Sequence, residues 1–125
     1  MTSISILKEM FKLLFKNDRL TDLVGNKIYP VIANEDTTFP FITFNRDSVY
    51  TEYCKDGRVL DNVTISFNIA STSYEESVEI AEEVRNAIEC KRIDNINMIR
   101  LTSVSEDFVE NTYIQQLQFT CNFDF

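Results

Sequence analysis

No other stretch of this chain concentrates as many reactive groups as the seven residues Tyr53-Cys54-Lys55-Asp56-Gly57-Arg58-Val59. It combines a thiol, two cations, a carboxylate and one of the chain's two glycines. Lys55 and Arg58 could stabilise a thiolate at Cys54, which is the nucleophilic form of cysteine. A structural interpretation competes with this one, because Asp56-Gly57 is a favoured pair in the two-residue turn of a β-hairpin. The sequence favours the turn.

The remaining composition argues against catalysis. The chain contains no histidine, so it lacks the commonest general base and the triads and dyads built on it. Glu75-Glu76 and Glu82-Glu83 are adjacent pairs, and adjacent positions on a helix do not face each other. Glu35-Asp36 lacks the spaced ligands and the glycine of a calcium loop, and two glycines are too few for a phosphate-binding loop. We therefore expect no enzyme activity, no catalytic residue and no cofactor.

The cysteines do not suggest a metal site. Cys54, Cys90 and Cys121 are widely spaced, and without histidine they cannot supply the four soft ligands of a zinc site. We expect free thiols in a reducing compartment. Cys121 alternates with Phe119 and Phe123, which predicts a small buried hydrophobic residue.

Charge and length limit the classes of partner. The 125 residues include 12 Lys and Arg against 20 Asp and Glu, a net charge of −8. Proteins that bind nucleic acid rely on a basic patch, so we expect no specific DNA or RNA binding. No apolar run reaches the ~18 residues that span a membrane, and charges at Lys8, Glu9, Lys12 and Lys16 interrupt any signal-peptide core. We expect a single domain, residues 1–125, made in the cytoplasm and without a membrane partner.

Two segments show the spacing of helices. Apolar residues recur every three or four positions in residues 3–15, which predicts an amphipathic helix capped by Ser3 or Ser5. Ser73 and Glu76 fit a capping box, and the helix that they begin runs to about Glu89. Its predicted apolar face consists of Val78, Ala81, Val84, Ala87 and Ile88. Between the two helices, residues 19–24 form a short turn that ends at Gly25, and residues 28–30 form a short extended piece.

Four segments alternate apolar and polar residues with the period of a strand. They are residues 39–44, 61–70, 98–104 and 113–125, of which the second alternates most regularly and the third most weakly. The order predicts an α+β fold, with an antiparallel sheet of about four strands, a long hairpin, and two helices packed on one face. The last strand fits either a free edge, which invites pairing with another chain, or a central position.

A turn at Asp56-Gly57 would set the register of the long hairpin. It places Phe44 opposite Ile69 and Tyr50 opposite Val63, which keeps apolar groups on one face. The same register opposes Lys55 to Arg58 and Glu52 to Asp61. A three-residue loop with a bulge at Gly57 avoids these repulsive pairs but places Asn45 opposite Phe67. We prefer the first register near the core, with a frayed or bulged tip.

The hairpin tip is also the predicted contact surface. Exposed aromatic residues are common at protein interfaces, and a hairpin that projects beyond the core has nothing of its own to pack against. We therefore predict that Tyr50, Tyr53, Lys55 and Arg58 contact another subunit or a partner protein.

Several motifs follow one another in a distinctive order. They are Leu23-Val24-Gly25-Asn26-Lys27-Ile28-Tyr29-Pro30, then Phe39-Pro40-Phe41-Ile42-Thr43-Phe44, then the strand of residues 63–70 leading into Ser73-Tyr74-Glu75-Glu76, and then residues 81–88. Together with the N-terminal helix, this order spans nearly the whole chain. It resembles the tail-completion proteins of long-tailed bacteriophages and prophages, also called tail terminators.

The resemblance implies a structural protein. Such proteins assemble as a ring, commonly a hexamer, on the head-proximal end of the tail tube, where they stop tube polymerisation and present a surface to the head-side connector. The implied partners are further copies of the chain, the tail-tube protein and the head–tail connector protein, and DNA passes through the ring without specific binding. The implied location is the virion tail, after assembly in the host cytoplasm.

Three other interpretations are compatible with the sequence. The first is a neck or minor tail protein of similar fold. The second is a small cytoplasmic ligand-binding domain or enzyme that uses Cys54 with Lys55 and Arg58. The third is an acidic mimic that binds a basic partner, for which the glutamates of the second predicted helix are the candidate surface.

Overall fold

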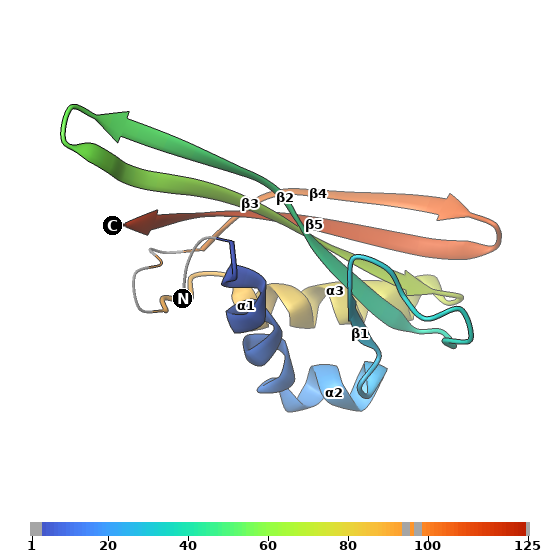
Figure 1. Cartoon of the computed structure of the whole chain (residues 1–125). Helices are drawn as coiled ribbons and strands as arrows, with labels where there is room; N and C mark the ends of the chain where they lie inside the picture. The colour runs from blue at the N-terminus through green and yellow to red at the C-terminus, as the bar shows by residue number, and fades with distance from the viewer. Residues whose placement is uncertain (1–3, 94–95, 97–98, 125) are drawn as a thin grey trace.

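The computed structural model describes residues 4–93, 96 and 99–124 (Figure 1). Within these residues the chain forms three helices and a five-stranded sheet. In chain order the elements are α1 (Ile6–Phe15), α2 (Asp18–Val24), β1 (Ile28–Pro30), β2 (Phe41–Cys54), β3 (Gly57–Ser71), α3 (Tyr74–Ile88), β4 (Arg100–Val109) and β5 (Thr112–Asp124). All helices lie on one face of the sheet, and the opposite face carries none of those described (Figure 1).

The sheet has the strand order β1-β2-β3-β5-β4. The β1 strand is parallel to β2, and the other neighbouring pairs are antiparallel. The predicted α+β class is confirmed, whereas the prediction of about four antiparallel strands and two helices is wrong in detail. Residues 28–30, predicted as a short extended piece, form the strand β1 of 3 residues, and residues 19–24, predicted as a short turn, lie within the helix α2 of 7 residues. Segments this short contain too few repeats of a strand or helix pattern to be counted from the sequence as full elements.

The last strand, β5, lies between β3 and β4, so the alternative of a free edge at this strand is wrong. The edge positions belong to β1 and β4. Two residues at the predicted ends of strands, Met98 and Phe125, lie outside the described residues.

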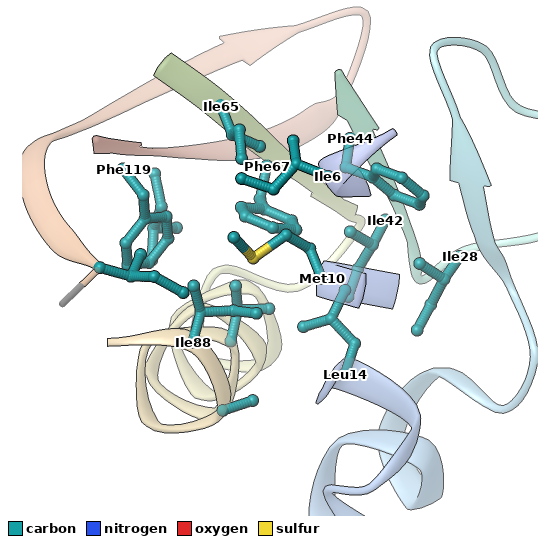
Figure 2. Close-up of a cluster of buried hydrophobic side chains, with 14 of the residues drawn as sticks. Ile6, Met10, Leu14, Ile28, Ile42, Phe44, Ile65, Phe67, Ile88 and Phe119 are labelled. Atoms are coloured by element: carbon teal, nitrogen blue, oxygen red, sulfur yellow. The ribbon is translucent and has the colours of Figure 1, made fainter. Parts of the chain in front are cut away.

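The core fills the space between the helices and the sheet (Figure 2). Phe67 on β3 and Phe119 on β5 are fully buried and pack edge-to-face, with ring centroids 5.6 Å apart. The predicted stripe of α1 is confirmed, because Ile6, Met10 and Leu14 are fully buried. On α3 the buried face is rotated from the predicted one: Ser77 and Ile80 are buried with Val84, Ala87 and Ile88, and Val78 and Ala81 are half-buried.

Local capping bonds begin two of the helices. The predicted cap at Ser73 is confirmed, since its hydroxyl accepts the backbone N–H of Glu76 at 3.3 Å. Ser5 occupies the N-cap position of α1 but makes no side-chain capping bond, and Ser3 lies outside the described residues. Sequence reasoning missed the cap of α2, where the Asn17 side chain accepts the backbone N–H of Leu20 at 3.1 Å.

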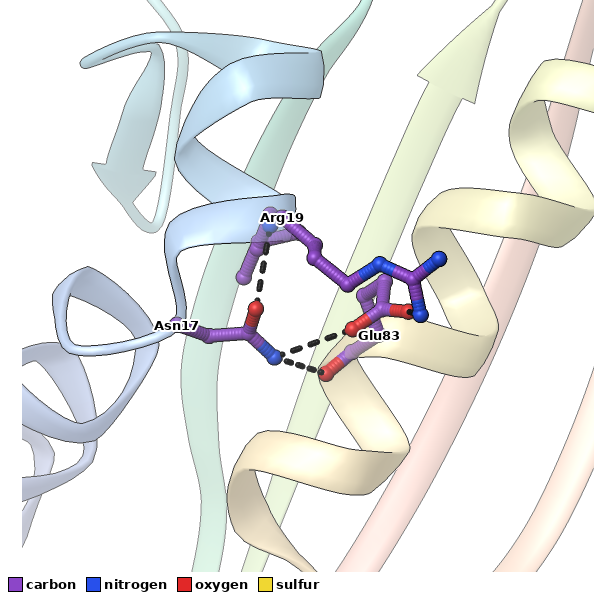
Figure 3. Close-up of polar contacts among 4 residues, drawn as sticks. Asn17, Arg19 and Glu83 are labelled. Carbon is purple, nitrogen blue, oxygen red and sulfur yellow. Dashed lines mark hydrogen bonds and ion pairs between the residues drawn. The ribbon is translucent and has the colours of Figure 1, made fainter.

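Asn17 also joins α2 to α3 (Figure 3). Its side-chain amide donates to the backbone carbonyl of Glu83 at 3.2 Å and to the carboxylate of Glu83 at 3.1 Å. Arg19 adds an ion pair to the same carboxylate at 3.6 Å, although the Arg19 side chain is 84% exposed and such pairs contribute little. Asn17 therefore stabilises the helices in two ways: it caps α2, and it binds Glu83 of α3.

Replacing Asn17 with alanine is expected to lower the free energy of unfolding by about 1–2 kcal/mol, because it removes the cap acceptor of α2 and the amide that binds Glu83. Urea unfolding followed by circular dichroism measures this loss. Asn17→Ser serves as the control, since serine keeps a capping oxygen but is too short to reach Glu83 in the same way. Serine should recover part of the loss, and equal loss in the two variants would contradict a contribution from the cap.

The register of the β2–β3 hairpin differs from the predicted one. Phe44 pairs with Phe67, and Tyr50 pairs with Asn62 rather than with Val63. The predicted pairs between Phe44 and Ile69 and between Tyr50 and Val63 are therefore wrong. Two register shifts account for the change, one between Arg46 and Ser48 and one between Glu52 and Tyr53. The first shift changes which β2 positions lie on the buried face: Ile42 and Phe44 lie there before it, and Val49, which pairs with Val63 and packs against the core, lies there after it.

The turn itself is displaced by one residue. Cys54 pairs with Gly57, so the two turn residues are Lys55 and Asp56. Gly57 has a φ of 121°, a conformation that favours glycine. Arg58 consequently pairs with Tyr53 and not with Lys55, which removes the repulsive pairing that the predicted register contained.

Candidate interaction surfaces

The outer part of the β2–β3 hairpin projects beyond the rest of the sheet. We call residues 50–60 the β2–β3 tip. The β1 strand reaches only as far as Phe44 along β2, and the β5 strand ends at Asp124, opposite Leu60. Apart from the pairing of Leu60 with Asp124, the described strands give the tip no neighbour beyond the hairpin itself, and the tip extends away from the helices at upper left (Figure 1).

The structure brings the four predicted contact residues to this tip. Tyr50 is 67% exposed and Tyr53 is 73% exposed, although both carry large apolar rings. Lys55 is exposed in the turn, and Arg58 lies opposite Tyr53 in the register. Their contact with another protein stays a prediction.

The base of the tip is held by a polar pair. Asp61 on β3 is 4% exposed, and its carboxylate accepts the hydroxyl of Thr51 on β2 at 2.5 Å. A buried carboxylate requires such a partner. The pair joins the two strands between the positions of Tyr50 and Tyr53, so a polar contact holds the hairpin together where the tyrosines are exposed.

The cysteines have different environments. Cys54 and Cys90 are exposed, and Cys121 is buried on β5, which confirms the prediction for Cys121. Burial raises the pKa of the Cys121 thiol to about 11, and the charge of Arg100 opposes this shift. Cys121 is therefore a neutral thiol near neutral pH and a poor nucleophile.

Alkylation with iodoacetamide at pH 8 is expected to modify Cys54 and Cys90 rapidly and to leave Cys121 unmodified in the folded chain, because thiolate and access are both required. Intact mass with peptide mapping counts the modified sites. The control is the same reaction in concentrated urea, where all three thiols should react. Rapid reaction of Cys121 in the folded chain would contradict its burial.

The helix-free face of the sheet is polar. Asp47, at the first register shift of β2, accepts the side-chain amides of Asn45 at 2.8 Å and Gln118 at 3.2 Å, and also accepts the hydroxyl of Ser66. The neighbouring side chains on this face are neutral amides and hydroxyls, namely Thr64, Asn68, Gln116 and Thr120. The face therefore suits contact with water or a polar surface.

Sequence reasoning missed a second exposed surface at the outer strand β4. We call residues 104–113 the β4–β5 tip. Val104, Phe108 and Val109 are 53%, 55% and 46% exposed, on a strand that forms one edge of the sheet. The available signal was the run of residues 103–110, in which three apolar residues stand among three carboxylates.

An aromatic cluster supports the β4–β5 tip. The rings of Phe108 and Tyr113 lie 4.7 Å apart, and those of Tyr113 and Tyr74 lie 5.5 Å apart. The Tyr74 hydroxyl donates to the carboxylate of Glu106 at 2.9 Å. This hydrogen bond and the negative charge of Glu106 raise the pKa of Tyr74. The tip is thus tied to the start of α3.

Two further observations concern metal ions and membranes. Among the residues that the structure describes, no group of three or more cysteine, aspartate or glutamate side chains is placed to hold a metal ion. None of the helices in the described ranges is long and apolar enough to cross a membrane.

Comparisons with known proteins agree with the resemblance seen in the sequence. Residues 8–122 match the model of the family described as tail completion protein gp17. Among solved structures, a chain from the virion of a native gene transfer agent particle has the same fold, with a TM-score of 0.81 and 13% identity over 93% of this chain and 92% of that one. No curated protein is similar enough to this chain to count as a match.

Proposed function

Because the chain belongs to the tail completion protein gp17 family and so has a structural role in a phage tail, we propose that it is a tail terminator that forms a ring on the end of the tail tube. In this role it would cap the tube, end its polymerisation and join it to the head-side connector. The observation that carries the proposal is the family match over residues 8–122. A structural tail protein needs no catalytic residue, which removes the support for an enzyme that uses Cys54.

The shape of the subunit supports a ring. Its two hairpin tips point to opposite ends of the sheet (Figure 1), so each subunit offers two different surfaces. Two different surfaces that meet head to tail generate a closed ring when the rotation between subunits closes. We propose that residues 1–125 act as one tail-completion domain in a ring, with a hexamer as the expected size.

The β2–β3 tip is the proposed contact with the tube or with a neighbouring subunit. Exposed tyrosines provide contact area at a low cost in side-chain entropy, and Tyr50 and Tyr53 are both more than half exposed. Lys55 and Arg58 add donors and positive charge to a tip that would otherwise be acidic through Glu52 and Asp56. These four residues are the proposed partner site.

The charge of the chain supports passage of DNA without binding. A net charge of −8 repels phosphates, and the helix-free face is built largely from neutral polar side chains. Assembly would take place in the host cytoplasm, and the tail-tube and connector proteins would be the partners in the virion tail.

Tube polymerisation with a defined amount of the chain tests this function. The tail-tube protein of the same phage or prophage is polymerised alone and with increasing amounts of the purified chain, and tube lengths are measured by electron microscopy. A terminator shortens the tubes as its amount rises. Unchanged lengths at excess chain would overturn the proposal, and binding to tubes without any change in length would favour the alternative of a neck or minor tail protein.

A further inference from the structure

An apolar groove lies between α1 and the sheet edge formed by β1 and β2. Its volume is about 410 Å³, within the range of pockets that hold a bulky group. It is lined by Leu7, Lys8, Phe11, Lys12, Pro30 and Phe44. The Phe11 ring lies 5.7 Å from the ring of Phe44. We call this site the α1 groove.

Exposed apolar residues extend the α1 groove. Val31 and Ile32 follow Pro30 directly and are 72% and 77% exposed. The backbone N–H of Val31 donates to the carbonyl of Phe44 at 2.8 Å, so this loop is fixed beside the groove. A joined apolar surface of this kind is a feature of interaction sites.

The rim of the α1 groove is positively charged in an acidic chain. Lys8, Lys12 and Lys16 are exposed along α1 and its C-terminal end. Glu9 is the only carboxylate among residues 4–17, and it lies 3.4 Å from Lys12. The groove therefore favours a partner that combines apolar side chains with carboxylates.

The β4–β5 tip has this combination. It exposes Phe108 and Val109 next to Asp107 and Glu110, and residues 101–124 contain no lysine or arginine. The β2–β3 tip fits less well, because its Lys55 and Arg58 balance its carboxylates. The acidic tip and α1 lie toward different ends of the subunit (Figure 1), so the contact would be made by two copies.

We propose that the α1 groove of one copy receives the β4–β5 tip of the next copy. Phe108 enters the apolar groove, and Asp107 and Glu110 face Lys8 and Lys12. The inference rests on the proposed function, since it assigns one subunit contact of the ring. Burying Phe108 removes exposed apolar surface from both copies, and the opposite charges select the orientation.

Charge reversal tests this contact on the full chain. The groove variant carries Lys8→Glu and Lys12→Glu, and the tip variant carries Asp107→Lys and Glu110→Lys. Self-association is measured by light scattering up to roughly millimolar concentration, where even weak contacts form. We expect the wild type to self-associate and each variant alone to associate about tenfold or more weakly.

The equimolar mixture of the two variants gives the decisive comparison. In the mixture, each reversed tip meets a reversed groove and each native tip meets a native groove, so association should return. Lys91→Glu with Arg92→Glu is the control, because both positions are exposed outside the groove and the change in charge is the same as in the groove variant. This control should associate like the wild type.

Three results would overturn the inference: a wild type that stays monomeric, variants that associate like the wild type, or a mixture that does not recover. The tube-capping assay distinguishes failure of this contact from failure of the proposed function. If all variants cap tubes like the wild type, the terminator function holds and the contact is wrong. If the mixture recovers association but the wild type leaves tube length unchanged, the contact holds and the terminator function is wrong.

Discussion

Replacing Phe67 with alanine is expected to lower the free energy of unfolding by about 3–5 kcal/mol. Phe67 is fully buried on β3, and its ring lies 5.6 Å from that of Phe119 and 6.1 Å from that of Phe44. Removal of the ring leaves a cavity among three strands. Since domains are stable by only about 5–15 kcal/mol, this loss is the largest that we expect from a single substitution. Denaturant unfolding monitored by circular dichroism measures it.

The matched control is Phe108→Ala, which makes the same chemical change at a residue that is 55% exposed. We expect it to cost only about 1 kcal/mol or less, because substitutions near the surface have small effects. Similar losses for the two variants would contradict the described core.

The second large effect is expected on tube capping. Replacing Tyr50 and Tyr53 with serine should abolish the shortening of tubes, because tyrosine is enriched among the few interface residues whose loss costs about 2 kcal/mol or more. Both rings are exposed in the isolated subunit, so the stability of the fold should stay close to that of the wild type. Tube length by electron microscopy and unfolding by urea measure the two properties separately.

Phe39→Ser is the control for the tyrosine variant. Phe39 is an aromatic residue that is 43% exposed, and it precedes β2 at the end opposite the β2–β3 tip. The Phe39→Ser variant should cap tubes like the wild type. If the double tyrosine variant caps tubes as well as this control does, the β2–β3 tip is not the contact surface.

The regular elements could be predicted from the sequence because each contains several periods of one pattern. Residues 63–69 place four apolar side chains at alternate positions, and all four are fully buried on β3. The α1 stripe repeats over two turns, and the capping box at Ser73 begins α3 where it was expected. In these segments local patterning and tertiary packing favour the same structure.

The details of the sheet could not be predicted in the same way. The register of β2 depends on two shifts, near Asp47 and near Tyr53, and no pattern in the sequence identifies which residue is left unpaired. The parallel pairing of β1 brings residues 28–30 beside residues 42–44. That contact depends on tertiary packing and on none of the local propensities.

The two candidate surfaces differ in the same way: one could be predicted from the sequence and the other could not. The exposed tyrosines were predicted because the Asp56-Gly57 pair indicates a hairpin, even though the turn residues are Lys55 and Asp56. The α1 groove was not predicted, because it joins residues of α1 to Pro30 and Phe44. In the sequence, Leu7 and Phe11 are indistinguishable from the core stripe of α1, and only the structure shows that they are half-buried.

Electron microscopy of tubes assembled with the labelled chain tests the terminator function most directly. Cys90 is exposed and can carry a gold label once Cys54 is replaced by serine. We predict a ring of label at one end of each tube, with tubes shorter than those of the tube protein alone. Label along the tube walls, or tubes without label and of unchanged length, would contradict the account.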